Sequence, residues 1–169
     1  MSAPTRSDLR PGRWEVVVAQ SRASFTARDV LHRPVTGTLP LRSATVDVGP
    51  DGSPSSVVAA LELAGVDTGN VRRDRDLRGR RFFDVQEHPV LRFRGGPAVT
   101  TPEGWTLEGS LGLGSTTCPV ALDVVRTGPT SVRATTTLDR RELGLTAPRL
   151  LVGAQVTVQL EVELEAPPY

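Results

Sequence analysis

Alternation of apolar and polar residues is the feature that most constrains how this chain can fold. Residues 156–164 read Val-Thr-Val-Gln-Leu-Glu-Val-Glu-Leu, so every even position is apolar and every odd position is polar. A period of two places the two sets of side chains on opposite faces of a β-strand, one buried and one solvated. Residues 105–113 repeat the pattern. One-sided alternation indicates antiparallel sheet, because buried parallel strands read as continuous apolar runs.

Shorter runs of the same kind occur along the chain and are separated by turn signals. Glycine and proline mark turns between them, as in residues 49–54 and 95–97. Many short strands with closely spaced turns predict an all-β antiparallel sandwich or barrel. The additional strands are predicted at residues 14–18, 23–27, 35–39, 44–48, 57–63, 91–94, 120–124 and 132–138.

Length and charge narrow the class of protein. The chain has 169 residues and a formal net charge of +1, which fits one domain with no long-range attraction to nucleic acid or acidic lipid. We expect a loose polar arm at residues 1–12 and a single domain at residues 13–169. No apolar run approaches the roughly 18 residues of a membrane span, and the N-terminus lacks a signal-like apolar core. A cytoplasmic location without stable membrane insertion is therefore expected.

Residues 68–89 have the most unusual composition in the chain. Six arginines and two aspartates fall within residues 72–81. Asn70 is a suitable N-cap and Gly79 a suitable end for a helix of about two turns. The interspersed aspartates and the neutral chain argue against a nucleic-acid surface. We interpret the segment as a lid whose arginines are solvated. Leu77, Phe82 and Phe83 then form its inner face, and the structural roles fall to Asn70, Arg73, Asp74 and Asp84.

The same segment carries a family resemblance. Its sequence contains Thr68-Gly69-Asn70, Arg73-Asp74, Leu77-Arg78, Phe82-Phe83-Asp84 and His88-Pro89. With these motifs, and with further matches at Ser24-Phe25, Gly37, Gly109, Pro119-Val120, residues 141–145 and Val152-Gly153, the chain resembles the YceI-like family from about Trp14 to Leu164. The resemblance implies a lipocalin-like antiparallel β-barrel of about eight strands, with a short helix closing one end.

The resemblance also implies a function. Members of the family are associated with polyisoprenoid lipids, so the expected function is non-enzymatic binding or carriage of a long apolar isoprenoid, either a quinone tail or a polyprenyl chain. No cofactor is expected apart from such a bound lipid or quinone, and the protein is expected to be a monomer or homodimer. The expected ligand-binding residues are Phe25, Leu61, Leu63, Leu77, Phe82, Phe83, Phe93, Trp105, Leu107, Leu122, Val156, Val158 and Leu160.

The chain departs from the family pattern in four places. Gln20-Ser21 stands where a His-Ser pair is common, and Gly79-Arg80-Arg81 replaces a less basic stretch. The loop between Gly144 and Val152 is short, and the secretory signal that is common in the family is not expected here. The short loop and the expected lack of a signal bear on ligand identity and on cellular compartment rather than on the fold.

Two rival functions remain open. An eight-stranded barrel is just wide enough to be filled by side chains or to hold one small ligand, and the residues alone favour a filled core. The first rival is accordingly a structural or stress-related interaction protein without a ligand. The second is an enzyme that uses Cys118 or a histidine. The sequence offers few candidate residues for an enzyme, because His32 and His88 are the only histidines and one cysteine cannot form a zinc cluster. No catalytic residue and no metal site are therefore expected.

Overall fold

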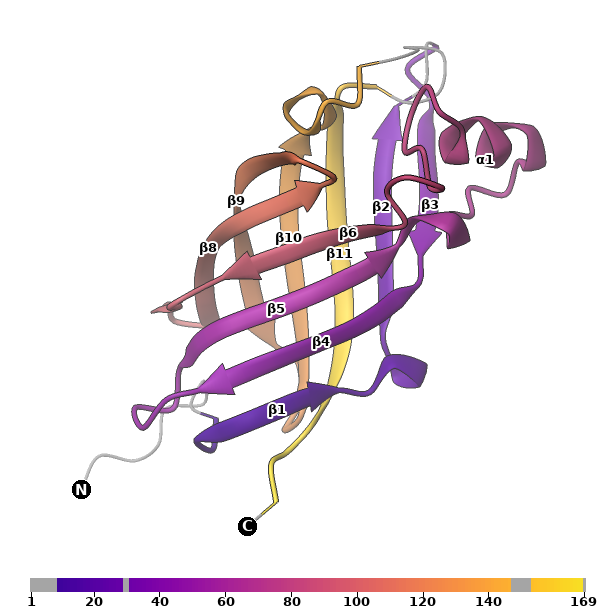
Figure 1. The fold of residues 1–169 in the computed structure, drawn as a ribbon. Coiled ribbons are helices and arrows are strands. Elements are labelled where there is room, and N and C mark those ends of the chain that lie inside the picture. Colours follow the sequence, from indigo (N-terminus) through magenta and orange to yellow (C-terminus); the bar gives the residue numbers. More distant parts are fainter. Residues whose placement is uncertain (1–8, 29–30, 147–152, 169) are drawn as a thin grey trace.

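A single antiparallel sheet, closed on itself, makes up most of the protein (Figure 1). The computed structural model describes residues 9–28, 31–146 and 153–168. Its elements, in chain order, are β1 (Gly12–Val16), η1 (Val18–Gln20), β2 (Arg22–Arg28), β3 (Pro34–Leu39), β4 (Leu41–Val48), β5 (Pro54–Glu62), η2 (Leu63–Gly65), α1 (Val71–Arg78), β6 (Val90–Gly95), β7 (Val99–Thr100), β8 (Gly104–Leu113), β9 (Thr116–Arg126), β10 (Ser131–Asp139), η3 (Arg140–Leu143) and β11 (Gln155–Glu165).

Eight of these strands form the closed ring, in the order β1-β4-β5-β6-β8-β9-β10-β11. The ring closes where β11 pairs with β1, through Glu15 with Glu165 and Val16 with Leu164. The predicted lipocalin-like antiparallel barrel is therefore confirmed. We call the end near η3 and α1 the upper end, and the end near the N- and C-terminal segments the lower end (Figure 1).

At two places in the barrel wall, two consecutive strands follow one another along the barrel with an interruption between them. β2 continues along the same edge of β11 that β1 begins, pairing Phe25 with Val158, and η1 fills the break between them. β3 likewise runs on into β4 through Pro40. Proline has no backbone N–H and fixes φ, so it interrupts the ladder at the bend. The β2–β3 hairpin thus forms the upper part of the wall and β1–β4 the lower part.

In the upper part of the wall, β3 has little strand pairing on one of its sides. On its side away from β2, the described residues pair with β3 only through the bridge between Thr38 and Asp67. The short helix α1 lies next to β3 at this place (Figure 1). Its N-terminus is capped by Asn70, whose side chain accepts a hydrogen bond from the Arg73 N–H at 3.0 Å, and it ends at Gly79. Both predicted helix ends are confirmed.

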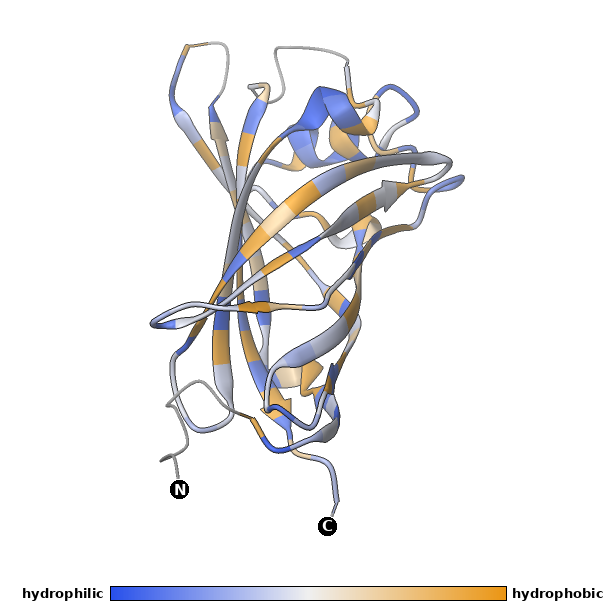
Figure 2. Ribbon diagram, turned by 90° about the vertical axis from the view of Figure 1, so that its left-hand side faces the viewer, coloured by the Kyte–Doolittle hydropathy of each residue, from blue (hydrophilic) through white to orange (hydrophobic). Residues whose placement is uncertain are grey.

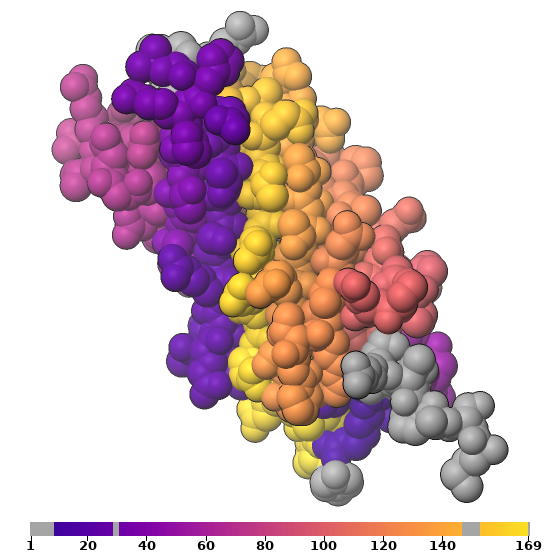
Figure 3. Space-filling model, turned by 180° about the vertical axis from the view of Figure 1, so that it is seen from behind, coloured from indigo at the N-terminus to yellow at the C-terminus, as the bar shows by residue number. Residues whose placement is uncertain are grey.

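Period-two alternation places the apolar side chains inside the barrel. Pairs such as Ala134 with Leu160 and Leu138 with Val156 lie opposite one another on β10 and β11. Apolar and polar bands alternate along the strands in Figure 2. From behind, the side chains of β2, β11 and β10 form a continuous wall (Figure 3).

The segment before β1 differs from the expected loose arm in its last residues. Residues 1–8 lie outside the described residues, but Leu9 is only 5% exposed and its N–H donates to the Gly52 carbonyl at 2.8 Å. Gly12 is already the first residue of β1. An isolated leucine among polar residues gives no periodic signal, which is why the sequence did not indicate this packing. Within the described ranges, no helix has the length and apolar character needed to cross a bilayer.

Candidate ligand-binding cavity

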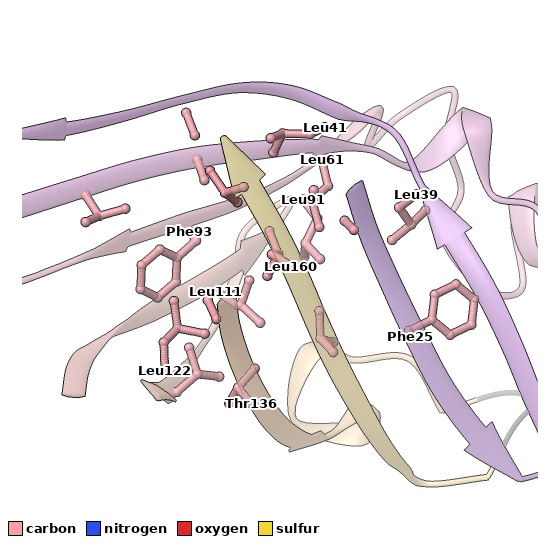
Figure 4. A pocket seen from close by; sticks show the side chains of 18 of the residues that line it. Phe25, Leu39, Leu41, Leu61, Leu91, Phe93, Leu111, Leu122, Thr136 and Leu160 are labelled. Atoms are coloured by element: carbon pink, nitrogen blue, oxygen red, sulfur yellow. The ribbon is translucent and has the colours of Figure 1, made fainter. Parts of the chain in front are cut away.

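The barrel encloses a cavity of about 200 Å³ that runs from the lid residues Phe82 and Phe83 down to Leu9 and Trp105. At about 10–15 Å³ per water position, this is room for on the order of fifteen waters. The wall is almost entirely hydrocarbon (Figure 4). An apolar space of this kind favours an apolar guest over water.

Most of the residues expected to bind ligand lie on this wall. The cavity is lined by Phe25, Leu61, Leu77, Phe82, Phe83, Phe93, Trp105, Leu107, Leu122, Val156, Val158 and Leu160. Leu63 is the exception: it is fully buried but does not line the cavity. β5 ends at Glu62 and the chain turns into η2, so the alternation that would have pointed Leu63 inward stops one residue earlier.

Burial indicates that the interior is hollow rather than filled. Val156, Val158 and Leu160 line the cavity, yet each is only half-buried. In a filled barrel these side chains would be covered by those of the opposite strands, because protein cores are close-packed. Of the two interpretations left open by the sequence, the structure favours the lined tunnel.

Glycines help to keep the lumen open. A Cβ added to Gly37 would lie 2.7 Å from Phe25 Cε1, and one added to Gly95 would lie 2.7 Å from Phe93 Cζ. A Cβ on Gly109 would lie 2.8 Å from the other side of the Phe93 ring. Both phenylalanine rings therefore rest over glycine backbone on the wall, where any other residue would push them toward the lumen.

The lid, defined here as residues 68–89, is held by a buried carboxylate. Asp74 is 7% exposed, and its Oδ1 accepts hydrogen bonds from the Thr68 N–H at 2.9 Å and from the Thr68 hydroxyl. Arg73 donates to the same residue, from Nε to Thr68 Oγ1 at 2.9 Å and from its guanidinium to the Thr68 carbonyl at 3.2 Å. Asp74 and Arg73 thus join the start of α1 to the turn before it, as their predicted structural role requires.

The inner face of the lid is apolar, as predicted. Leu77 is 1% exposed, and Phe82 and Phe83 pack edge to face with ring centroids 4.8 Å apart. Asp84 supports the following turn: it adopts a positive φ of 52°, and its carbonyl accepts the His88 N–H at 2.8 Å. Arg72, Arg75, Arg80 and Arg81 are exposed, which agrees with the interpretation of the arginines as the solvated side of the lid.

Arg140 is a site residue that was not identified from the sequence. It is 3% exposed, and its guanidinium lies 5.6 Å from the centroid of the Phe82 ring. Its Nε donates to the Gly153 carbonyl at 3.1 Å, and its Nη1 donates to the Leu145 carbonyl. A signal was present: residues 132, 134, 136, 138 and 140 form one period-two series, and all of them line the cavity. Most of the loop noted as short, residues 147–152, lies outside the described residues.

A second cluster, which we call the floor, closes the lower end. It consists of Leu9, Trp14, Val48, Trp105 and Leu164, all 6% exposed or less. The Trp14 indole N–H donates to the Arg10 carbonyl at 2.8 Å. The Trp105 indole N–H is buried and has no hydrogen-bond partner among the residues that the structure describes.

The candidate catalytic groups lie apart from the cavity wall. Cys118 is buried outside the lining, and burial, together with the charge of Glu142, raises the pKa of its thiol, which disfavours the nucleophilic thiolate. His32 is exposed, and the His88 ring packs against Gly114, where a Cβ would lie 2.7 Å from its Nδ1. Among the described residues, no three His, Cys, Asp or Glu side chains lie close enough together to hold a metal ion.

These features define a hollow antiparallel barrel with an apolar lumen, a lid at one end and a floor at the other. Residues 14–164 match the YceI-like domain, and the chain therefore belongs to the YceI-like family.

Similar solved structures have the same fold at low sequence identity. BcnA of Burkholderia cenocepacia superposes with a TM-score of 0.75 at 18% identity, covering 89% of this chain and 99% of that one. A polyisoprenoid binding domain of Saccharophagus degradans, implicated in plant cell wall breakdown, superposes with a TM-score of 0.70 at 16% identity, covering 91% and 98%. These likenesses show the fold.

A curated relative matches over a shorter stretch. A UPF0312 protein of Serratia proteamaculans is 33% identical over 73 residues, which are 43% of this chain and 38% of that protein. The alignment thus spans well under half the length of this relative.

Proposed function

We propose that this protein binds a long apolar isoprenoid-type lipid, a quinone tail or a polyprenyl chain, non-covalently inside its barrel. The observation that carries the proposal is the hydrocarbon wall of the enclosed cavity. Family membership and the similarity to a polyisoprenoid binding domain support a lipid of this class.

Burial of apolar surface alone provides enough free energy to bind such a lipid. Burial of apolar surface contributes about 25 cal/mol per Å², so an isoprene unit of roughly 100 Å² contributes about 2 kcal/mol. Association costs about 4–15 kcal/mol. Several units are therefore needed for tight binding, which favours an extended chain over a small apolar molecule.

The direct test is to extract the purified protein with organic solvent and to identify the lipid by mass spectrometry. We expect an isoprenoid in near-stoichiometric amount. Straight-chain acyl lipids alone would contradict the isoprenoid class, and repeated absence of any lipid, both after purification and after incubation with polyprenols, would contradict the function.

A pair of variants at neighbouring residues tests whether the lipid lies in the lumen. Ala59 lines the cavity, whereas Val58 on the same strand is 44% exposed. Ala59→Phe fills the lumen and is expected to lower the amount of bound lipid severalfold, while Val58→Phe, which adds an aromatic ring to the outer face, leaves it unchanged. Equal lipid content in the two folded variants would place the lipid elsewhere.

The enzyme alternative is tested with Cys118→Ser. Because the thiol lies outside the cavity wall, this variant is expected to retain the full amount of lipid. Loss of a measurable turnover of the bound lipid in this variant would instead support the enzyme.

A further inference from the structure

We propose that the floor limits the length of the lipid chain that the barrel accepts, with Leu9 as the stop. The inference rests on the proposed function and adds to it the residue that decides which chain lengths fit. Leu9 is the most N-terminal residue on the cavity wall among those the structure describes, and it meets Trp105 and Leu164 there.

The floor is fastened from two directions, which makes it suitable as a fixed stop. The Leu9 N–H donates to Gly52 in the turn between β4 and β5, at 2.8 Å. One residue later, the Arg10 carbonyl accepts the Trp14 indole N–H from β1, also at 2.8 Å. Gly12 then turns the chain into β1 with a φ of +128°, a conformation that favours glycine. Leu9 is thus held directly by the turn between β4 and β5, and through its neighbour Arg10 by β1.

The lid is a longer segment whose backbone, among the described residues, is connected to the rest of the barrel only near its two ends. The connections are the Thr38–Asp67 bridge, one residue before the lid, and the hydrogen bond from the Leu63 N–H to the Pro89 carbonyl at 3.1 Å. Segments with few backbone connections to a sheet open at lower free energy than strands in a ladder. The lid is therefore the end through which a chain enters, and the floor is the end at which it stops.

The distribution of polar and apolar residues along the wall also favours a lipid whose tail points from the lid to the floor. Of the described residues that line the cavity, Arg140 alone carries a charge, and it lies at the upper end beside Phe82. The lower part of the wall is formed by residues such as Leu9, Val162 and Leu164. Burying a polar head group among these would leave most of its oxygens without partners, at considerable cost, because the Trp105 indole N–H is the single unpaired buried side-chain group among the described residues. The head group therefore stays at the upper end, and the tail points to the floor.

The dimensions give a length. β11 has eleven residues, hence a length of about 37 Å at ~3.4 Å per residue. With the usual strand tilt of about 35–45°, the height along the barrel axis is roughly 28 Å. Three extended backbone bonds span roughly 3.5 Å, so the four main-chain bonds of an isoprene unit span roughly 5 Å. The lumen therefore takes on the order of five or six units.

The test is to titrate the delipidated protein with polyprenols of three to eight isoprene units. In the unmodified protein we expect affinity to rise about tenfold per added unit, from burial less the cost of ordering the chain, and to stop rising near five or six. Both tryptophans of the chain belong to the floor, so their fluorescence should change only with chains that reach it.

Two substitutions of Leu9 should move this plateau in opposite directions. Leu9→Ala is expected to shift it about one unit longer, and Leu9→Phe about one unit shorter. The matched control is Leu63→Ala, which truncates a fully buried leucine that does not line the cavity and should leave the plateau in place.

The outcomes separate the two proposals. A plateau at the same length in the unmodified protein and both Leu9 variants would overturn the floor as a length stop while leaving lipid binding intact. Failure of every polyprenol to bind the unmodified protein would overturn the proposed function itself. If Leu9→Ala does not fold, the shift expected of Leu9→Phe still decides the question.

Discussion

At the scale of single residues, the glycines on the wall are as important as the apolar side chains. Alternation predicts which residues point inward, but whether they fill the interior depends on what lies across from them. Gly37 is paired with Phe25, and Gly95 is paired with Gly109. In each case a glycine lies where a larger residue would force an aromatic ring into the lumen.

This argument predicts the effect of Gly37→Ala. The new methyl group would lie 2.7 Å from Phe25 Cε1 and 3.0 Å from the Asp67 carbonyl, so the ring must move toward the lumen. We expect a loss of stability of about 1–3 kcal/mol and a clear drop in bound lipid. Gly112→Ala is the control, because its Cβ would meet nothing closer than 3.7 Å. Urea unfolding and lipid mass spectrometry measure the two effects; similar behaviour of the two variants would contradict the argument.

A second residue-scale prediction concerns pH. Asp139 caps η3 by accepting the Arg141 N–H at 2.9 Å, and it pairs with the Arg141 guanidinium at 2.7 Å; these contacts lower its pKa to about 2, from an ordinary value of 3.8. A lowered pKa stabilises the folded state above the unfolded-state value, and this contribution is lost as the pH falls through the folded-state value.

Asp139→Asn should accordingly lower the urea midpoint at pH 5–7, and the difference from the unmodified protein should close as the pH falls toward 2. The Asp139 side chain is 20% exposed and that of its partner Arg141 is 59% exposed, so salt should weaken the effect. A difference that persists unchanged at pH 2 would indicate that packing, rather than the charge of Asp139, is responsible.

At the scale of elements, the lid shows which parts of the sequence argument hold. Local signals were enough to find α1: Asn70 and Gly79 mark its ends, and the inward set of Leu77, Phe82 and Phe83 is confirmed. The interruptions between β1 and β2 at η1 and between β3 and β4 at Pro40 were not predicted. Their positions depend on pairing with β11 and β5, which are distant in sequence.

Residues of the cavity wall were likewise predicted where local sequence determines their position, and were missed where long-range contacts determine it. The strand positions of the wall could be read from alternation, and only Leu63 was misplaced, because a strand end is not fixed by periodicity. Arg140 continues the period-two series, but it lies beyond the strand predicted at residues 132–138. Leu9 carried no local signal, since its burial depends on the tertiary contacts of the floor.

Truncation of the lid should separate its inner face from its outer face. Leu77 is 1% exposed, so Leu77→Ala is expected to cost about 2–5 kcal/mol of stability and to release bound lipid. Arg80 is exposed, and Arg80→Ala should stay within about 0.5 kcal/mol of the unmodified protein. Chemical denaturation together with lipid retention during dialysis is the measurement. Equally small effects of both changes would contradict the lid.

At the scale of the whole molecule, a hollow core makes stability depend on the guest. A protein that leaves its interior open gives up packing that a filled core would have, and a ligand that binds only the folded state restores it. At a free ligand concentration one hundred times the Kd, the gain is about 2.7 kcal/mol.

We therefore expect delipidated protein to melt several degrees below lipid-loaded protein. At roughly 2–4 °C per kcal/mol for a chain of this size, the difference is on the order of 5–11 °C. Differential scanning calorimetry before and after solvent extraction, with added polyprenol as the reversal, measures it. An identical melting temperature in all three states would count against a lipid-filled lumen.

The seam between β1 and β11 has a further consequence, for biosynthesis. Pairing Glu15 with Glu165 joins the first described strand to the last, so nearly all of the barrel must leave the ribosome before it can close. Such non-local pairing is slow, and an open sheet with free edges readily associates with other chains. Until the seam forms, the lumen can be reached from the side without any movement of the lid. If the proposed lipid meets the nascent sheet, it would be enclosed as the last strand docks, and folding itself would then be an opportunity for loading.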